Sequence, residues 1–111
     1  MTLNTKAQGI VYEFKHVVNM SAKQLEDWLE TEESKSVGQQ EDGGEPIGHQ
    51  SGRRIVELLR KNQAEYDEDD LAQIQWVIDS IRRHLARRPE GDIAHTRWRH
   101  ALMNLGHDPL Q

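Results

Sequence analysis

The segment from Asp67 to Leu85 has the most regular apolar spacing in the chain, and it constrains the fold more than any other feature. Its apolar residues recur at alternating intervals of three and four, namely Leu71, Ile74, Ile78, Ile81 and Leu85. This spacing keeps side chains on one face of an α-helix. Acidic residues open the segment and arginines close it, as the helix dipole favours. The sequence therefore predicts a long helix here that buries one face.

Four further segments have helical patterns. Ile10 to Asn19 places Ile10, Phe14, Val17 and Val18 on one face. Ser21 and Gln24 form a capping box for a second helix, which buries Leu25, Trp28 and Leu29 and ends in the acidic run from Glu30 to Glu33. A third helix is predicted to begin at the N-cap Ser51, with Ile55, Leu58 and Leu59 buried. A short final helix has Trp98, Ala101, Leu102 and Leu105 on its apolar face and ends at Gly106. The prediction is an all-α fold: a single small domain, residues 1–111, of about five helices.

A polar segment from Ser34 to Gln50 separates the second and third predicted helices. It contains four of the eight glycines and has only Val37 and Ile47 as apolar anchors. Asp42-Gly43-Gly44 is a turn signal that would fold the segment into a short hairpin. A flexible linker and an ordered functional loop are both consistent with this composition, because long loops in compact domains are commonly one or the other.

Charge is distributed unevenly along the chain. Residues 1–50 contain four lysines and nine acidic residues, whereas residues 51–111 contain ten basic and ten acidic residues and all of the arginines. There is no cysteine, so disulfides and thiolate metal sites are excluded. No apolar run is long enough for a membrane span, and the N-terminus does not resemble a signal peptide. A cytoplasmic protein is the expectation.

Catalytic signatures are lacking. His95 and His100 are five residues apart, which is not the spacing of two metal ligands on one helix face, and no acidic residue lies between them. His107 and Asp108 could pair, but one pair near the C-terminus is weak evidence for a general base. The segment Ser34–Gly38 lacks the ordered glycines of a phosphate-binding loop, and there is no nucleophile elbow. We therefore expect no enzyme activity, no cofactor and no metal.

The arginines are the best candidates for a binding site. Arg53 and Arg54 fall at the predicted start of the third helix, where the dipole disfavours cations and backbone N–H groups can hold an anion. The candidate anion-binding or nucleic-acid-binding residues are Lys35, Ser36, Ser51, Arg53, Arg54, Arg60, Lys61, Arg87, Arg88, Arg97 and Arg99. The alternative is that these cations form ion pairs with acidic residues of neighbouring helices.

Several strings resemble a small bacterial family of unknown function, and the resemblance covers nearly the whole chain. They include Ser34-Lys35-Ser36-Val37-Gly38, Gln50-Ser51-Gly52-Arg53-Arg54, Arg87-Arg88-Pro89-Glu90-Gly91-Asp92 and Thr96-Arg97-Trp98-Arg99. Members of that family often carry a provisional DNA-binding label. The resemblance therefore implies nucleic-acid binding and singles out Arg53, Arg54, Arg97 and Arg99, while it implies no catalytic residue.

The leading functional hypothesis is a small non-catalytic protein that binds nucleic acid, with DNA the first choice, by contacting phosphates through its C-terminal helices. Two alternatives remain open. One is a protein-interaction module or homodimer that uses the acidic N-terminal half. The other is a site for a small anionic ligand in residues 34–54.

Overall fold

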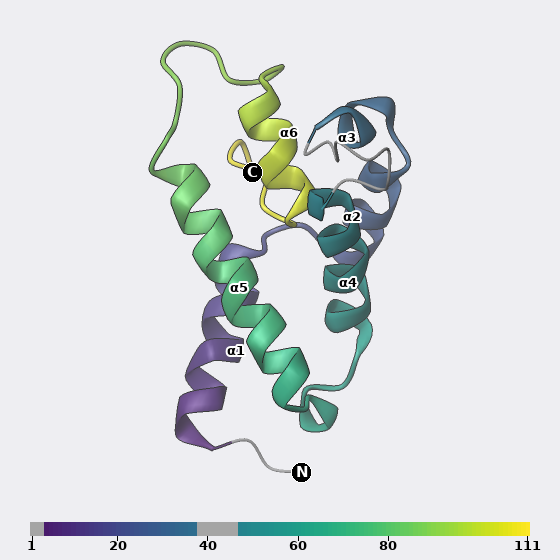
Figure 1. Ribbon diagram of the computed structural model, residues 1–111, viewed down its shortest axis with the longest axis vertical. Coiled ribbons are helices and arrows are strands. Elements are labelled where there is room, and N and C mark those ends of the chain that lie inside the picture. The colour runs from purple at the N-terminus through teal and green to yellow at the C-terminus, as the bar shows by residue number, and fades with distance from the viewer. Residues whose placement is uncertain (1–3, 38–46) are drawn as a thin grey trace.

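The computed structural model describes residues 4–37 and 47–111, and its regular structure is entirely helical there (Figure 1). The six α-helices of this described part are α1 (Thr5–Val17), α2 (Ala22–Leu29), α3 (Glu32–Ser36), α4 (Ile47–Arg60), α5 (Glu68–Leu85) and α6 (Arg97–Asn104). One 3-10 turn, η1 (Gln63–Glu65), separates α4 from α5. The predicted all-α class is confirmed, with one short helix more than expected.

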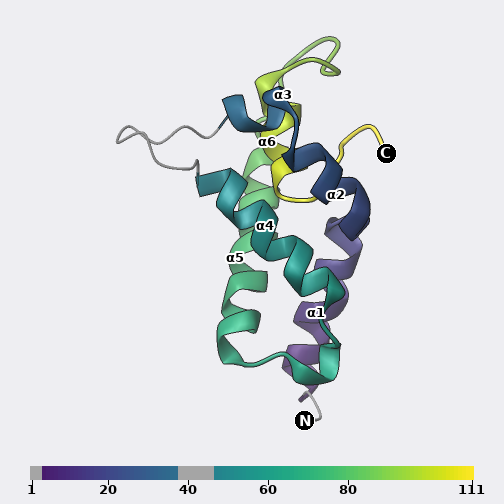
Figure 2. The same ribbon diagram turned by 90° about the vertical axis from the view of Figure 1, so that its right-hand side faces the viewer.

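The helices pack as two pairs that α6 joins. Helix α2 lies along α4, and α1 lies along α5, while α6 contacts α2, α3, α4 and α5 (Figures 1 and 2). Apolar side chains from α1, α2, α4, α5 and α6 meet in one core, with Phe14, Leu25, Ile55, Ile78 and Leu102 almost completely buried. Burial of these side chains is the main force that holds the pairs together.

Helix α5 confirms the strongest sequence pattern. Ile74, Ile78 and Ile81 are buried, and Asp67 caps the helix in a reciprocal capping box with Asp70. The stripe is weaker at its ends than the spacing predicts, because Leu71 is only half-buried and Leu85 is exposed. The capping box of Ser21 and Gln24 is also present.

The prediction that the second helix ends in the acidic run is wrong. Helix α2 ends at Leu29, and Thr31 starts the separate helix α3 by accepting a hydrogen bond at Oγ1 from the Ser34 N–H (3.2 Å). Glu32 and Glu33 therefore occupy the first turn of α3. An acidic side chain at a helix start interacts favourably with the dipole, so the two glutamates are well placed.

The predicted boundaries of the polar loop, residues 34–50, are also wrong. Helix α3 extends to Ser36, and α4 already begins at Ile47, so Ser51 lies inside α4 and is buried instead of capping it. The predicted hairpin at residues 42–44 falls outside the described residues.

Gly52 is the reason why the sequence pattern predicts a later start for α4 than the structure has. Serine followed by glycine usually lies at a helix boundary, because glycine disfavours a helix interior. Here a Cβ on Gly52 would lie 2.6 Å from the carbonyl oxygen of Asn104 and 2.7 Å from Leu29 Cδ2. The glycine is thus required for the close approach of α4 to α6 and α2.

Candidate functional site

Arg53 and Arg54 do not form the predicted anion site at a helix start. Because α4 begins at Ile47, both arginines lie in the second turn, where the backbone N–H groups are within the helix. Arg54 instead donates from Nη2 to Oδ1 of Asp70 (2.6 Å), and Lys61 donates from Nζ to Oδ2 of the same carboxylate (2.7 Å). The two cations therefore connect α4 to the first turn of α5.

Asp70 is a buried carboxylate with three kinds of support. Its side chain is 1% exposed, and it also accepts the backbone N–H of Asp67 (3.1 Å). Burial alone would raise the pKa of Asp70, but the hydrogen bonds from Lys61 and Asp67 and the charges of Lys61 and Arg54 outweigh it, so the pKa is lowered. Arg54 and Lys61 consequently stabilise the contact between α4 and α5.

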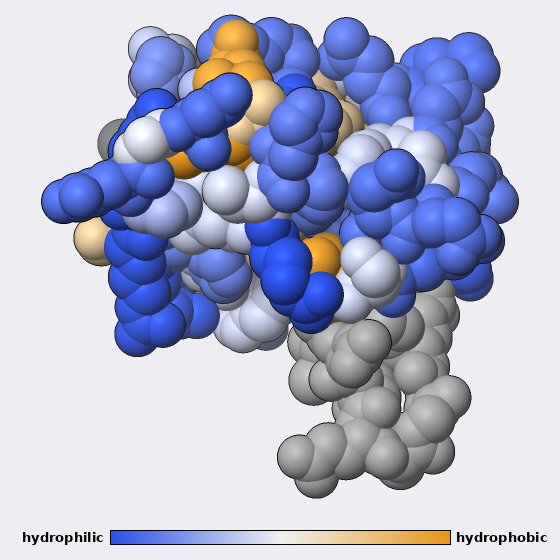
Figure 3. Space-filling model, turned by 90° about the horizontal axis from the view of Figure 1, so that it is seen from above, coloured by the Kyte–Doolittle hydropathy of each residue, from blue (hydrophilic) through white to orange (hydrophobic). Residues whose placement is uncertain are grey.

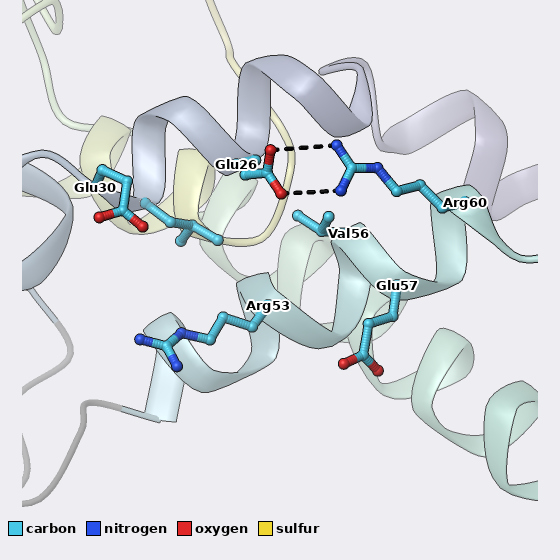
Figure 4. Close-up of a pocket in the computed structure, with 7 residues that line it drawn as sticks. Glu26, Glu30, Arg53, Val56, Glu57 and Arg60 are labelled. Atoms are coloured by element: carbon cyan, nitrogen blue, oxygen red, sulfur yellow. Dashed lines mark hydrogen bonds and ion pairs between the residues drawn. The ribbon is translucent and has the colours of Figure 1, made fainter.

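A groove of about 300 Å³ lies between α2 and α4, and it contains two more of the candidate arginines (Figure 4). Arg60 forms a two-pronged ion pair with Glu26, with Nη1–Oε2 and Nη2–Oε1 distances of 2.9 and 3.3 Å. This hydrogen-bonded arginine lowers the pKa of Glu26. Arg53 and Glu30 lie near the other end of the groove in Figure 4. Arg60 thus ties α4 to α2 along one side of the groove.

Arg99 is also a structural residue. Its Nε and Nη2 donate to the two carboxylate oxygens of Asp108 (3.1 and 3.0 Å), and its Nη1 donates to the carbonyl of Ala94 (2.8 Å). Burial raises the pKa of Asp108, but the bonds from Arg99 and from the Leu110 N–H, with the nearby charges, lower it overall. Arg99 therefore fixes the chain on both sides of α6.

The remaining candidate cations are exposed and gather at one end of the molecule. We call Lys35, Arg87, Arg88 and Arg97 the arginine end. It lies at the top of Figure 1, where α3, the α5–α6 connection and the start of α6 come together, and Figure 3 shows that hydrophilic residues cover most of it. None of the four side chains forms an ion pair within residues 4–37 and 47–111.

Two contacts show how the arginine end is held together. Arg97 donates from Nη2 to the carbonyl oxygen of Ser36 (3.1 Å), which joins α6 to α3. The guanidinium of Arg88 lies 5.6 Å from the ring centroid of Trp98, whose indole N–H donates to the carbonyl of His84. Segments that are distant in sequence thus present their cations on the same end of the molecule.

The arginine end is not uniformly basic. Glu33 is exposed on α3, and Glu90 and Asp92 lie in the α5–α6 connection. The pKa of His100 in α6 is lowered by burial first and then by the charges of Arg99, His95 and Arg97, against the opposing charge of Glu33. Basic and acidic side chains are therefore mixed at this end of the molecule.

Sequence reasoning missed the polar residue that positions α6. Asn104 is 1% exposed, and its Oδ1 accepts hydrogen bonds from Trp28 Nε1 (2.7 Å) and Ser34 Oγ (2.6 Å). Its Nδ2 donates to the carbonyl of Ser34 (3.0 Å). A signal for it existed, because Asn104 is three residues after Ala101 and therefore falls within the apolar face of α6.

Two classes of site have no support in the described residues. No group of three or more histidine and acidic side chains there is arranged to hold a metal ion. No helix of this part has the length and apolar character that crossing a bilayer requires.

The fold and the site define a small all-helical protein with an exposed cationic end. The chain belongs to the DUF3140 family, described as proteins of unknown function, whose model matches residues 13–103. The matched range includes all of the arginine end. Comparisons with curated proteins and with solved structures give no match.

Proposed function

We propose that this protein is a non-catalytic nucleic-acid-binding protein that contacts backbone phosphates through the arginine end. The observation that carries the proposal is the division of its cations. Arg54, Arg60, Lys61 and Arg99 are held by carboxylates, whereas the four cations of the arginine end are exposed at one end of the molecule. Arginines are well suited to such a role, because their planar fork matches the oxygens of a phosphate.

The overall charge of −5 works against binding to a polyanion, but a local cationic surface can override it. Binding to phosphates depends on the local potential, and the acidic surplus lies in the first half of the sequence. DNA is the first ligand to test, since the bacterial family that the sequence resembles often carries a provisional DNA-binding label.

The test compares the parent with the triple variant Arg87→Gln, Arg88→Gln and Arg97→Gln. Fluorescence anisotropy with labelled DNA and RNA, at about 50 and 200 mM salt, measures the affinity and its salt dependence. Each lost phosphate contact should reduce the log–log salt slope by about 0.9, so the triple variant should lose up to about three units. Melting temperatures establish that the variant is folded.

A second variant controls for net charge. Lys6, Lys15 and Lys23 are exposed on α1 and α2, and changing all three to glutamine removes the same formal charge away from the arginine end. It should retain the salt slope of the parent. Equal losses in the two triple variants would show that only net charge matters, and unchanged binding in the arginine variant would overturn the proposal.

The groove between α2 and α4 favours a second candidate function, a protein-interaction module. Leu29 and Val56 are apolar residues that line the groove. Its charged lining is mixed, with Glu26, Glu30 and Glu57 acidic and Arg53 and Arg60 basic, and Arg60 is paired with Glu26. A partner segment with apolar side chains and a basic side chain opposite Glu30 would match this lining. Light scattering tests for a homodimer. Glu30→Lys should weaken association with a second copy of the chain or with another protein that carries such a segment.

A further inference from the structure

Trp76 differs from the other two tryptophans in its surroundings. Trp28 and Trp98 are half-buried, and each donates its indole N–H to a protein oxygen. Trp76 is 40% exposed on α5, and its N–H makes no hydrogen bond to the described part of the chain. Exposing a ring of this size gives up burial that would stabilise the fold, so a surface role is worth seeking.

Trp76 lies in line with Arg83 on the outer face of α5 and with Arg87 in the turn that follows the helix. Arg83 and Arg87 follow it by seven and eleven residues, which are spacings that return to the same side of a helix. Arg87 continues the last turn, since its N–H donates to the carbonyl of His84 (3.0 Å). Arg83 lies roughly 10 Å beyond Trp76 along the axis. The stripe therefore runs from an exposed aromatic ring to the arginine end.

The interactions of neighbouring side chains decide which cations of this stripe can contact a ligand. Arg82 is paired with Glu13 of α1, so it belongs to the α1–α5 contact. Asp79 lies beside the line between Trp76 and Arg83, and its Oδ1 accepts a hydrogen bond from Gln75 Nε2 (3.0 Å). The guanidinium of Arg83 is held on the helix surface by a bond to Ser80 Oγ (3.1 Å).

We infer that this stripe binds single-stranded nucleic acid, with a base stacked on Trp76 and the following phosphates on Arg83 and Arg87. The inference rests on the proposed function and specifies its ligand. Single-strand binding combines a cationic track with aromatic side chains, because an unpaired base offers its face to a ring. In a duplex the base faces are covered by stacking, so an exposed tryptophan would add nothing to phosphate contacts.

The experiment measures binding of a labelled single strand and of the corresponding duplex at one salt concentration. Trp76→Ala should weaken single-strand binding by roughly 5- to 100-fold, the range expected for loss of one stacked base, and leave duplex binding unchanged. Trp76→Phe should retain most of the affinity, because a ring is still present. Tyr12→Ala is the matched control, since Tyr12 is an aromatic residue on α1 that is 76% exposed.

Two further measurements sharpen the result. Thermal melts show whether the alanine variant is folded, and intrinsic fluorescence should be quenched by the single strand in the parent but much less in Trp76→Phe. Asp79→Asn should strengthen single-strand binding, because it removes a negative charge beside the phosphate track.

The outcomes separate this inference from the proposed function. Unchanged single-strand binding in a folded Trp76→Ala variant overturns the inference. If binding is lost only in the arginine triple variant, phosphate binding stands and base stacking does not. If the parent binds neither strand form, both ideas fail.

Discussion

Single buried polar residues determine how α6 is held. Asn104 replaces an apolar side chain on the inner face of α6, and it satisfies groups from α2 and α3 at the same time. Buried donors and acceptors without partners are unfavourable, so the three helices fit together in only one arrangement. Arg97 adds a surface link between α6 and α3. The position of the arginine end therefore depends on Asn104.

Replacing Asn104 by leucine tests this dependence. The change should destabilise the protein by about 2–3 kcal/mol, because the buried Ser34 hydroxyl and the Trp28 N–H lose their acceptor. Urea unfolding measures the free energy of unfolding. In a double-mutant cycle, Ser34→Ala should destabilise the Asn104→Leu protein less than it destabilises the parent. Strictly additive changes would show that the two side chains act independently.

At the scale of elements, two helices use glycine differently: Gly9 in α1 has open space around it, whereas Gly52 in α4 is needed for close packing. Gly9 in α1 has no atom within 4 Å of the place where a Cβ would be, whereas a Cβ on Gly52 in α4 would meet the backbone of α6. Helix propensity favours alanine over glycine by about 1 kcal/mol at both positions. Crowding of a packed interior typically costs about 1–3 kcal/mol, so at Gly52 it outweighs propensity.

The two substitutions should therefore change the melting temperature in opposite directions. Gly9→Ala should raise it by a few degrees, and Gly52→Ala should lower it, because α4 must move away from α6 and Leu29. Thermal unfolding followed by circular dichroism measures both variants under the same conditions. A Gly52→Ala protein that melts above the parent would mean that α4 and α6 are not in close contact.

For the whole molecule, the sequence predicts the helix class and much of the core, because apolar spacing is a local property of the chain. Ile74, Ile78 and Ile81 are examples. It does not predict the true start of α4, since the need for Gly52 comes from α6, more than fifty residues later.

The candidate site is only partly predictable from the sequence, because it too depends on contacts between segments that are distant in the chain. A list of cations does not reveal that Arg54 meets Asp70 or that Arg99 meets Asp108, because those pairs form only after the helices pack.

Titratable groups spread over the whole fold make its stability depend on pH. Asp70 and Asp108 have lowered pKa values in the folded state, so they bind protons more readily when the chain is unfolded. Their contribution to the free energy of unfolding is complete above the ordinary carboxyl pKa of 3.8. It is lost as the pH falls through the lower pKa values that the two carboxyls have in the folded protein. The pKa of His100 is also lowered in the folded state, from its ordinary value of 6.5, so below that pH protonation favours the unfolded chain. Stability should therefore decline in two stages on acidification.

Lys61 has a raised pKa because of its hydrogen bond to Asp70, and burial raises the pKa of Tyr66. Both residues retain their protons more strongly when folded, so stability should also fall above about pH 10.

Urea midpoints across the pH range should give a plateau of stability between about pH 7 and 10. His100→Gln should flatten the first acid stage, which begins below the ordinary histidine pKa of 6.5. Asp70→Asn should lower the plateau and flatten the second stage, because its carboxylate no longer titrates. Acid slopes in both variants that match those of the parent would show that neither group controls the acid response.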